Sequence, residues 1–213
     1  MRSLLKARKG GVLWLCFEVQ NPYEKPILST EKMVKKRQSV FFILCGTNGT
    51  GKTTLLRKLV DTDKKLLVID PDGMEWNDLS EIDIARVGEV LPNKKARVIS
   101  PSADDLDFLK DFQQGNLVLD DCRYYVKSRI EESIRQTLVR RRQKEIDVYA
   151  VAHSMTEVPP TFWVFATHLI LFKTKDNPSR LRQNIPMYKE MTEKHIPEIN
   201  SHASHHYYRV IPL

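Results

Sequence analysis

The chain has 213 residues, of which 41% are hydrophobic, so it is long and apolar enough to form one domain with its own core. A formal net charge of +7 is compatible with binding to nucleic acid or to other acidic surfaces. The three cysteines lack the spacing of a metal site or a disulfide framework, and the apolar runs are too short to span a bilayer, so we expect a reduced protein without a transmembrane segment.

The composition changes near residue 38. Residues 1–38 are rich in Lys and Arg and contain Pro22 and Pro26, whereas the apolar segments of a regular fold begin at residue 39. We therefore predict a basic N-terminal extension over residues 1–38, either packed on the core or appended to it.

A glycine-rich segment follows the first predicted strand, at 39–45, and precedes a helix predicted at 54–60. It matches the phosphate-binding pattern G-x-x-x-x-G-K-[ST], in which the glycines allow consecutive backbone N–H groups to point at an anion. Lys52 is expected to reach the outer phosphates of a nucleoside triphosphate, and the Thr53 hydroxyl to hold Mg²⁺. The residues predicted to bind the nucleotide are Gly46, Thr47, Asn48, Gly49, Thr50, Gly51, Lys52, Thr53 and Thr54.

The rest of the chain alternates apolar segments with helical ones. Helices are predicted at 103–113 and 126–144, the second because its apolar residues recur every four positions. Continuous apolar strands alternating with helices indicate a mainly parallel sheet covered on both faces. We predict an α/β fold, a three-layer αβα sandwich of the P-loop NTPase (RecA/ASCE-like) class, and a P-loop ATPase domain over 39–213. The further strands are predicted at 66–69, 96–99, 117–119, 148–152 and 169–172.

Two acids, Asp120 and Asp121, follow the strand predicted at 117–119. Parallel sheets bind ligands at the carboxyl ends of their strands, so both side chains are expected at the nucleotide. Asp120 is predicted to hold Mg²⁺ through water as the partner of Thr53, and Asp121 to activate the attacking water. The alternative is a turn with two solvated acids.

Three consecutive arginines, Arg140, Arg141 and Arg142, precede the strand that ends at His153. Cations are favourable at a helix C-terminus, so a solvated helix end is one interpretation. The other is an arginine finger, supplied by one of the three, that reaches the γ-phosphate bound by a neighbouring subunit. His153 is predicted to sense that phosphate through a hydrogen bond, although a lone histidine is more often structural.

Residues 202–209 contain three histidines and two tyrosines. This stretch could bind a metal or a partner, but its spacing matches no known metal site. We favour a polar turn that leads into a last strand.

Four stretches together resemble the HerA/FtsK branch of P-loop ATPases, over about residues 39–185. They are the phosphate loop, residues 68–76, the Walker B strand at 117–121 and residues 142–153. Residues 68–76 are similar to the family's "DPxGEY" segment with one residue inserted before the Glu, and His153 replaces a strand-ending Gln. The family stretch has an arginine eleven residues before its strand-ending Gln, and this resemblance makes Arg142 the finger candidate and Arg140 and Arg141 the alternatives. Residues 176–180 resemble a "DSR"-like segment, which makes Arg180 a further alternative.

Cellular members of that branch usually carry extra domains, and a bare motor of this size resembles the genome-packaging ATPases of tailless, membrane-containing viruses. The resemblance implies an ATPase that converts ATP and water to ADP and phosphate while it moves double-stranded DNA. It also implies a homo-oligomeric ring, a pentamer or a hexamer, around DNA held independently of sequence. Capsid or virion membrane proteins would be further partners, in the host cytoplasm or on the virion.

Three alternatives remain open at this point. A nucleotide kinase-like phosphotransferase also uses a phosphate loop and arginines that cover the phosphates. A nucleotide-dependent switch or DNA-binding protein would show little ATPase activity. A filamentous-phage assembly ATPase would normally add a transmembrane segment.

Overall fold

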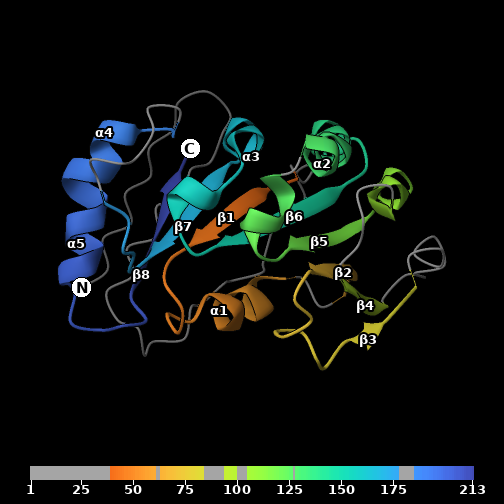
Figure 1. Ribbon diagram of the computed structural model, residues 1–213, viewed down its shortest axis with the longest axis horizontal. Helices are drawn as coiled ribbons and strands as arrows, with labels where there is room; N and C mark the ends of the chain where they lie inside the picture. The colour runs from red at the N-terminus through yellow and green to blue at the C-terminus, as the bar shows by residue number, and fades with distance from the viewer. Residues whose placement is uncertain (1–38, 61–62, 84–93, 100–104, 127, 178–184) are drawn as a thin grey trace, which may run out of the picture. The chain divides into compact units, whose positions relative to one another are not determined.

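The computed structural model of the protein describes residues 39–60, 63–83, 94–99, 105–126, 128–177 and 185–213 (Figure 1). The predicted basic extension over 1–38 and the finger candidate Arg180 lie outside these ranges. Within them the chain forms one eight-stranded sheet with the strand order β3-β4-β2-β5-β6-β1-β7-β8. All neighbouring strands run parallel except β7 and β8, which pair antiparallel.

The central strands are buried over nearly their whole length, as continuous apolar segments predict for a sheet covered on both faces. Every residue of β5 and β6 is buried, and so is every residue of β1 except Phe42. The strands are β1 (Phe41–Cys45), β2 (Lys65–Asp70), β3 (Ser80–Glu81), β4 (Lys95–Ile99), β5 (Gly115–Leu119), β6 (Ile146–Ala152), β7 (His168–Phe172) and β8 (Tyr208–Pro212).

Helices cover both faces of the sheet, which confirms the predicted three-layer α/β sandwich (Figure 1). Helix α1 (Lys52–Leu59) lies on one face, and α2 (Ser128–Arg140) and α3 (Pro160–Phe165) lie on the other. Successive strand residues point to opposite faces, so Leu44 packs with Leu56 of α1 while Ile43 belongs to the core beneath α2 and α3. Helices α4 (Tyr188–Glu190) and α5 (Ile196–Ser201) lie beside β8.

Short helical turns connect these elements. They are the 3₁₀ turns η2 (Asp105–Lys110), η3 (Cys122–Val126) and η4 (Met155–Glu157) and the π-helical turn η6 (Met191–His195). Strand β8 follows the histidine-rich stretch, which confirms the polar turn and last strand predicted there. Among the described residues, none of the helices has the length and apolar character needed to cross a membrane.

Two predicted helices are longer than the observed ones. The segment predicted as a helix at 103–113 is described from residue 105, where it forms the 3₁₀ turn η2. The helix predicted to reach residue 144 ends at Arg140, because β6 begins at Ile146 and the chain needs the intervening residues to turn. Glu145 in this turn has a positive φ of 56°, a conformation that no α-helix contains.

Candidate nucleotide-binding and hydrolysis site

The phosphate loop joins the carboxyl end of β1 to the start of α1. Gly51, at the N-cap of α1, has a left-handed φ of 92°, which favours glycine there. A Cβ on Gly46 would lie 2.6 Å from the Cβ of Phe172, so only glycine fits against β7. The backbone N–H of Thr47 donates to the Lys173 carbonyl at 2.9 Å, which anchors the loop to the end of β7.

Lys52 is held inside this loop. Its ammonium group donates to the carbonyls of Gly46 at 2.6 Å and Thr47 at 2.9 Å, and lies 3.5 Å from Nδ1 of His153. The side chain is only 6% exposed, and this burial lowers the pKa of Lys52. Burial and then the nearby Lys52 ammonium lower the pKa of His153, which favours a neutral imidazole at this position. The lysine and the predicted sensor are therefore brought together at the ends of β1 and β6.

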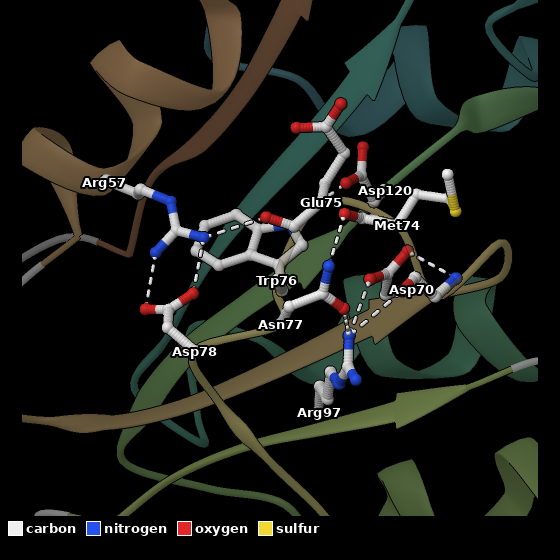
Figure 2. Close-up of polar contacts among 10 residues, drawn as sticks. Arg57, Asp70, Met74, Glu75, Trp76, Asn77, Asp78, Arg97 and Asp120 are labelled. Atoms are coloured by element: carbon white, nitrogen blue, oxygen red, sulfur yellow. Dashed lines mark hydrogen bonds and ion pairs between the residues drawn. The ribbon is translucent and has the colours of Figure 1, made fainter.

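The Asp120 carboxylate lies at the end of β5, where both of its oxygens accept hydrogen bonds. Figure 2 shows it beside Trp76. Oδ2 accepts from the indole N–H of Trp76 at 3.0 Å, and Oδ1 accepts from the backbone N–H of Asp121 at 3.0 Å. Burial raises the pKa of Asp120 to about 6, although the two hydrogen bonds oppose this shift. The carboxylate is therefore fixed in orientation, and it titrates close to neutral pH.

The Asp121 carboxylate is bound by a neighbouring arginine. Arg123 donates to it through Nη2 at 2.6 Å and through Nε at 2.9 Å. Burial raises the pKa of Asp121, but the hydrogen bonds and charge of Arg123 outweigh burial, so the net pKa is lowered. The residue is ionised and ready to accept a hydrogen bond from water, but the arginine competes for the same oxygens.

Arg57 of α1 and the segment after β2 enclose the Trp76 side chain, and the sequence did not predict this arrangement (Figure 2). Arg57 of α1 stacks over the indole, with its guanidinium carbon 4.2 Å from the ring centroid. The same guanidinium makes two hydrogen bonds of 2.7 Å to the Asp78 carboxylate and one of 2.9 Å to the Glu75 carbonyl. Because Trp76 is 1% exposed, its indole N–H needs a hydrogen-bond partner, and that partner is Asp120 at the end of β5.

A second arginine secures the same segment from β4. Arg97 donates to the Asn77 side-chain oxygen at 2.7 Å and to the Gly73 carbonyl at 3.2 Å, and it pairs with Asp70 at 3.7 Å (Figure 2). The signal in the sequence was the likeness of 68–76 to the family segment. That likeness marked the segment but did not indicate what its side chains contact.

A cleft of about 500 Å³ opens at the carboxyl edge of the sheet. It is bordered by most of the predicted site residues, namely Asn48, Gly49, Gly51, Lys52, Thr53, Thr54, Asp120, Asp121 and His153. Gly46, Thr47 and Thr50 instead hold the loop together, and the buried Thr50 hydroxyl donates to the Thr47 carbonyl at 2.8 Å. A volume of this size is typical of small-molecule sites.

The three clustered arginines lie away from this cleft. Arg141 is 5% exposed, and its guanidinium donates to the carbonyls of Leu138 at 3.1 Å and Phe165 at 2.9 Å. Two of its guanidinium nitrogens bind carbonyls of its own subunit, so Arg141 is less suited to act as a finger than its two exposed neighbours. Arg140 and Arg142 are exposed near the amino end of β6, whereas the phosphate loop lies at the carboxyl end of the parallel strand β1.

A parallel sheet with a glycine-rich loop after β1 and an acid after β5 defines the fold of a P-loop NTPase. No known family model matches the sequence. The chain is 29% identical over 124 residues to a putative ABC transporter ATP-binding protein of Saccharolobus solfataricus, SSO1893. That match covers 57% of this chain but only 21% of the relative, so the chain spans about a fifth of its length.

Solved structures extend the likeness over most of the chain. The genome packaging NTPase B204 from Sulfolobus turreted icosahedral virus 2, in complex with sulfate, has a TM-score of 0.57 at 13% identity, over 82% of this chain and 91% of B204. B204 in complex with ATP-gammaS has a TM-score of 0.56 at 13% identity, over 81% and 96% of the two chains. The DNA-packaging ATPase B204 from Sulfolobus turreted icosahedral virus has a TM-score of 0.56 at 12% identity, over 81% and 96%. These likenesses show the α/β P-loop NTPase fold.

Proposed function

We propose that the protein is an ATPase that uses ATP hydrolysis to move double-stranded DNA and packages a viral genome into a capsid. The observation that carries the proposal is that Lys52, Asp121 and His153 border the same cleft as the phosphate loop. The likeness of the fold to a genome packaging NTPase, over 91% of that chain, supports the packaging role.

The residues around the cleft have distinct tasks in this chemistry. Backbone N–H groups of the phosphate loop and the Lys52 ammonium hold the β- and γ-phosphates. Asp121 accepts a proton from the attacking water, whose oxygen bonds to the γ-phosphorus as the bond to ADP breaks. His153 donates a hydrogen bond to the γ-phosphate, and thereby distinguishes the state before hydrolysis from the state after it.

The donor set fits a magnesium ion. The Thr53 hydroxyl and the Asp120 carboxylate border the same cleft, and Mg²⁺ prefers hard oxygen ligands while keeping several waters. Thr53 would hold the ion directly and Asp120 through water, and the bound ion would neutralise charge on the phosphate oxygens. Within the described ranges, the His, Cys, Asp and Glu side chains form no cluster of three or more that could hold a metal by itself. Phosphate and water oxygens would therefore complete the shell.

A ring of subunits, a pentamer or a hexamer, is part of this proposal, and the position of the exposed Arg142 supports it. Within one subunit this side chain lies at the opposite end of the sheet strands from the phosphate loop, so only a neighbouring subunit can bring it to a γ-phosphate. Double-stranded DNA would pass through the ring and contact basic side chains through its phosphates. Binding would then be independent of sequence and would weaken steeply with salt. Capsid or virion membrane proteins would be further partners of the ring, in the host cytoplasm or on the virion.

Replacing Arg142 with Ala is expected to lower DNA-stimulated turnover by at least about tenfold while ATP still binds, because the finger acts on a neighbour's phosphate. Mixing Arg142→Ala subunits with Lys52→Ala subunits should restore part of the activity, since some interfaces then combine an intact finger with an intact loop. Arg140→Ala alters the other exposed arginine at the same helix end and tests the alternative finger: a loss there, with Arg142→Ala unchanged, would assign the role to Arg140. Mixed rings that assemble but regain no activity would count against Arg142.

Replacing Trp76 with Phe is expected to raise the pH at which Mg²⁺-dependent turnover reaches half its maximum. The indole N–H stabilises the ionised form of Asp120, so its loss raises a pKa that already lies at about 6. Turnover measured from pH 5 to 8 tests this. Trp163→Phe, which removes an equally buried indole from α3 on the other face of the sheet, should leave the pH profile unchanged.

The proposed function is tested by ATP hydrolysis measured with and without double-stranded DNA, together with particle size in solution. We expect a ring-sized particle whose turnover rises when DNA is added, and no phosphorylated small-molecule product. Turnover that is indifferent to DNA would contradict a translocase. Transfer of the γ-phosphate to a nucleotide would instead indicate a kinase.

A nucleotide-dependent switch with little turnover is the second candidate function. The observation that favours it is the ion pair between Arg123 and Asp121, which occupies the oxygens that a general base needs. ATP binding with negligible hydrolysis, both with and without DNA, would support the switch.

A further inference from the structure

The histidine-rich turn that precedes β8 lies directly against the phosphate loop. A Cβ built on Gly51 would lie 3.4 Å from Nδ1 of His206, and a Cβ built on Gly49 would lie 3.9 Å from Nε2 of His205. His206 also borders the cleft that contains Lys52. A stretch that the hydrolysis chemistry does not use is thus part of the wall of the site.

Hydrogen bonds and ring stacking give this turn a definite shape. The imidazole of His202 stacks on Tyr207, with ring centroids 3.8 Å apart and planes inclined by 14°. Nδ1 of His202 accepts from the Ser204 N–H at 3.1 Å, and the Ser204 hydroxyl accepts from the His206 N–H at 3.3 Å. The backbone at His206 is therefore positioned by hydrogen bonds within its own turn.

The turn and the phosphate loop share one anchor, at the end of β7. The Lys173 ammonium donates to the His202 carbonyl, while the Lys173 carbonyl accepts from the Thr47 N–H at 2.9 Å. A single residue thus fixes the distance between the two segments. The backbone of the histidine turn is thereby placed beside the phosphate loop, and the His206 ring borders the cleft.

The strand order indicates which end of a bound nucleotide lies near His206. Strand β1 stands between β6 and β7 in the sheet. The hydrolytic groups Asp121 and His153 follow β5 and β6, so the terminal phosphate lies on that side of the loop. The nucleoside must then leave the loop on the opposite side, toward β7 and β8, where the histidine turn lies.

We propose that His206 forms a stacking surface for the base of the bound nucleoside triphosphate, an inference that rests on the proposed nucleotide site. Its ring is exposed, and His205 packs edge-on beside it, with centroids 5.8 Å apart and planes inclined by 70°. Planar side chains stack on nucleobases, and stacking is tolerant of base identity because every base has a π-face. The surface therefore binds adenine and guanine alike.

The test is calorimetric titration of the full chain with three probes in the presence of Mg²⁺: ATP, GTP and inorganic tripolyphosphate. His206→Ala is expected to weaken ATP and GTP by about tenfold, which is in the range found for loss of a base-stacking ring, and to leave tripolyphosphate affinity unchanged. His206→Phe keeps a flat ring without a hydrogen-bonding nitrogen, and should keep the affinity for both nucleotides.

Two outcomes would overturn the assignment. Unchanged ATP affinity in His206→Ala would mean that the ring does not contact the base. An equal loss for tripolyphosphate would mean that it contacts the phosphates instead. Lys52→Ala separates this inference from the site itself: if that variant still binds all three probes, the proposed nucleotide site is wrong, whereas loss of all three with no effect of His206→Ala removes only the stacking role.

Discussion

Replacing Lys52 with Ala is expected to abolish ATP binding at micromolar concentrations and to reduce turnover by more than about a hundredfold. The ammonium group is the one cation that the loop itself directs into the cleft, and it is only 6% exposed, so its attraction for phosphate is weakly screened. Burial lowers the pKa of Lys52 from its normal value of 10.5, because the charged form loses hydration. Calorimetric titration with ATP and phosphate release measure the two losses.

The matched control is Lys58→Ala. Lys58 lies on the same helix, in its last turn, and its side chain is exposed. Both variants remove one lysine from α1, but only the first removes a charge from the cleft. Because Lys52 also donates to two loop carbonyls, the melting temperatures of both variants must be compared with that of the parent. A folded Lys52→Ala variant that binds ATP as tightly as the parent would reject the nucleotide site.

Replacing Asp121 with Asn is expected to reduce hydrolysis by about a thousandfold and to leave ATP affinity within a few fold of the parent. The amide cannot accept a proton from water, yet it has the shape of the carboxylate. Asp121 has a positive φ of 46°, a conformation that Asn tolerates well, so the backbone at the end of β5 should be preserved. Single-turnover hydrolysis and equilibrium binding, measured on the same preparation, separate the two effects. Unchanged hydrolysis would show that another group activates the water.

The companion variant is Arg123→Ala, which removes the guanidinium from the Asp121 carboxylate. Arg123 lowers the pKa of Asp121, so its loss should raise that pKa and make the carboxylate a stronger base. If Arg123 restrains hydrolysis, turnover without DNA should rise in this variant and should fall when Asp121→Asn is added. If Arg123 only orients the base, turnover should fall in Arg123→Ala as well as in the double variant.

Much of the site was predictable because its signals are local. The pattern around Lys52 specifies a turn, a helix start and a phosphate contact within a few residues, and strand ends place Asp120 at the same edge of the sheet. The limits of the six strands predicted with bounds agree with the structure to within a few residues, since buried parallel strands are continuous apolar segments. The short, exposed strand β3 has no such segment and was missed. The helix ending at Arg140 was overestimated because charged residues continue a helical pattern as readily as they form a turn.

The arginine cluster shows where local signals fail. Arg140, Arg141 and Arg142 are indistinguishable by composition and by position relative to the strand. Burial separates them: the middle one is turned into the protein toward carbonyls of α2 and α3, and the outer two face solvent. Only the packing of the two helices against each other determines which guanidinium is enclosed.

The sequence by itself determined that a phosphate loop and a pair of acids meet at one edge of a parallel sheet, because each feature is encoded within its own segment. The tertiary structure decided which groups those acids contact. Trp76 lies 44 residues from Asp120, and His206 is further still from the phosphate loop. Such contacts depend on the order of the strands in the sheet and on how the loops close over its edge, which hydrophobic periodicity does not specify.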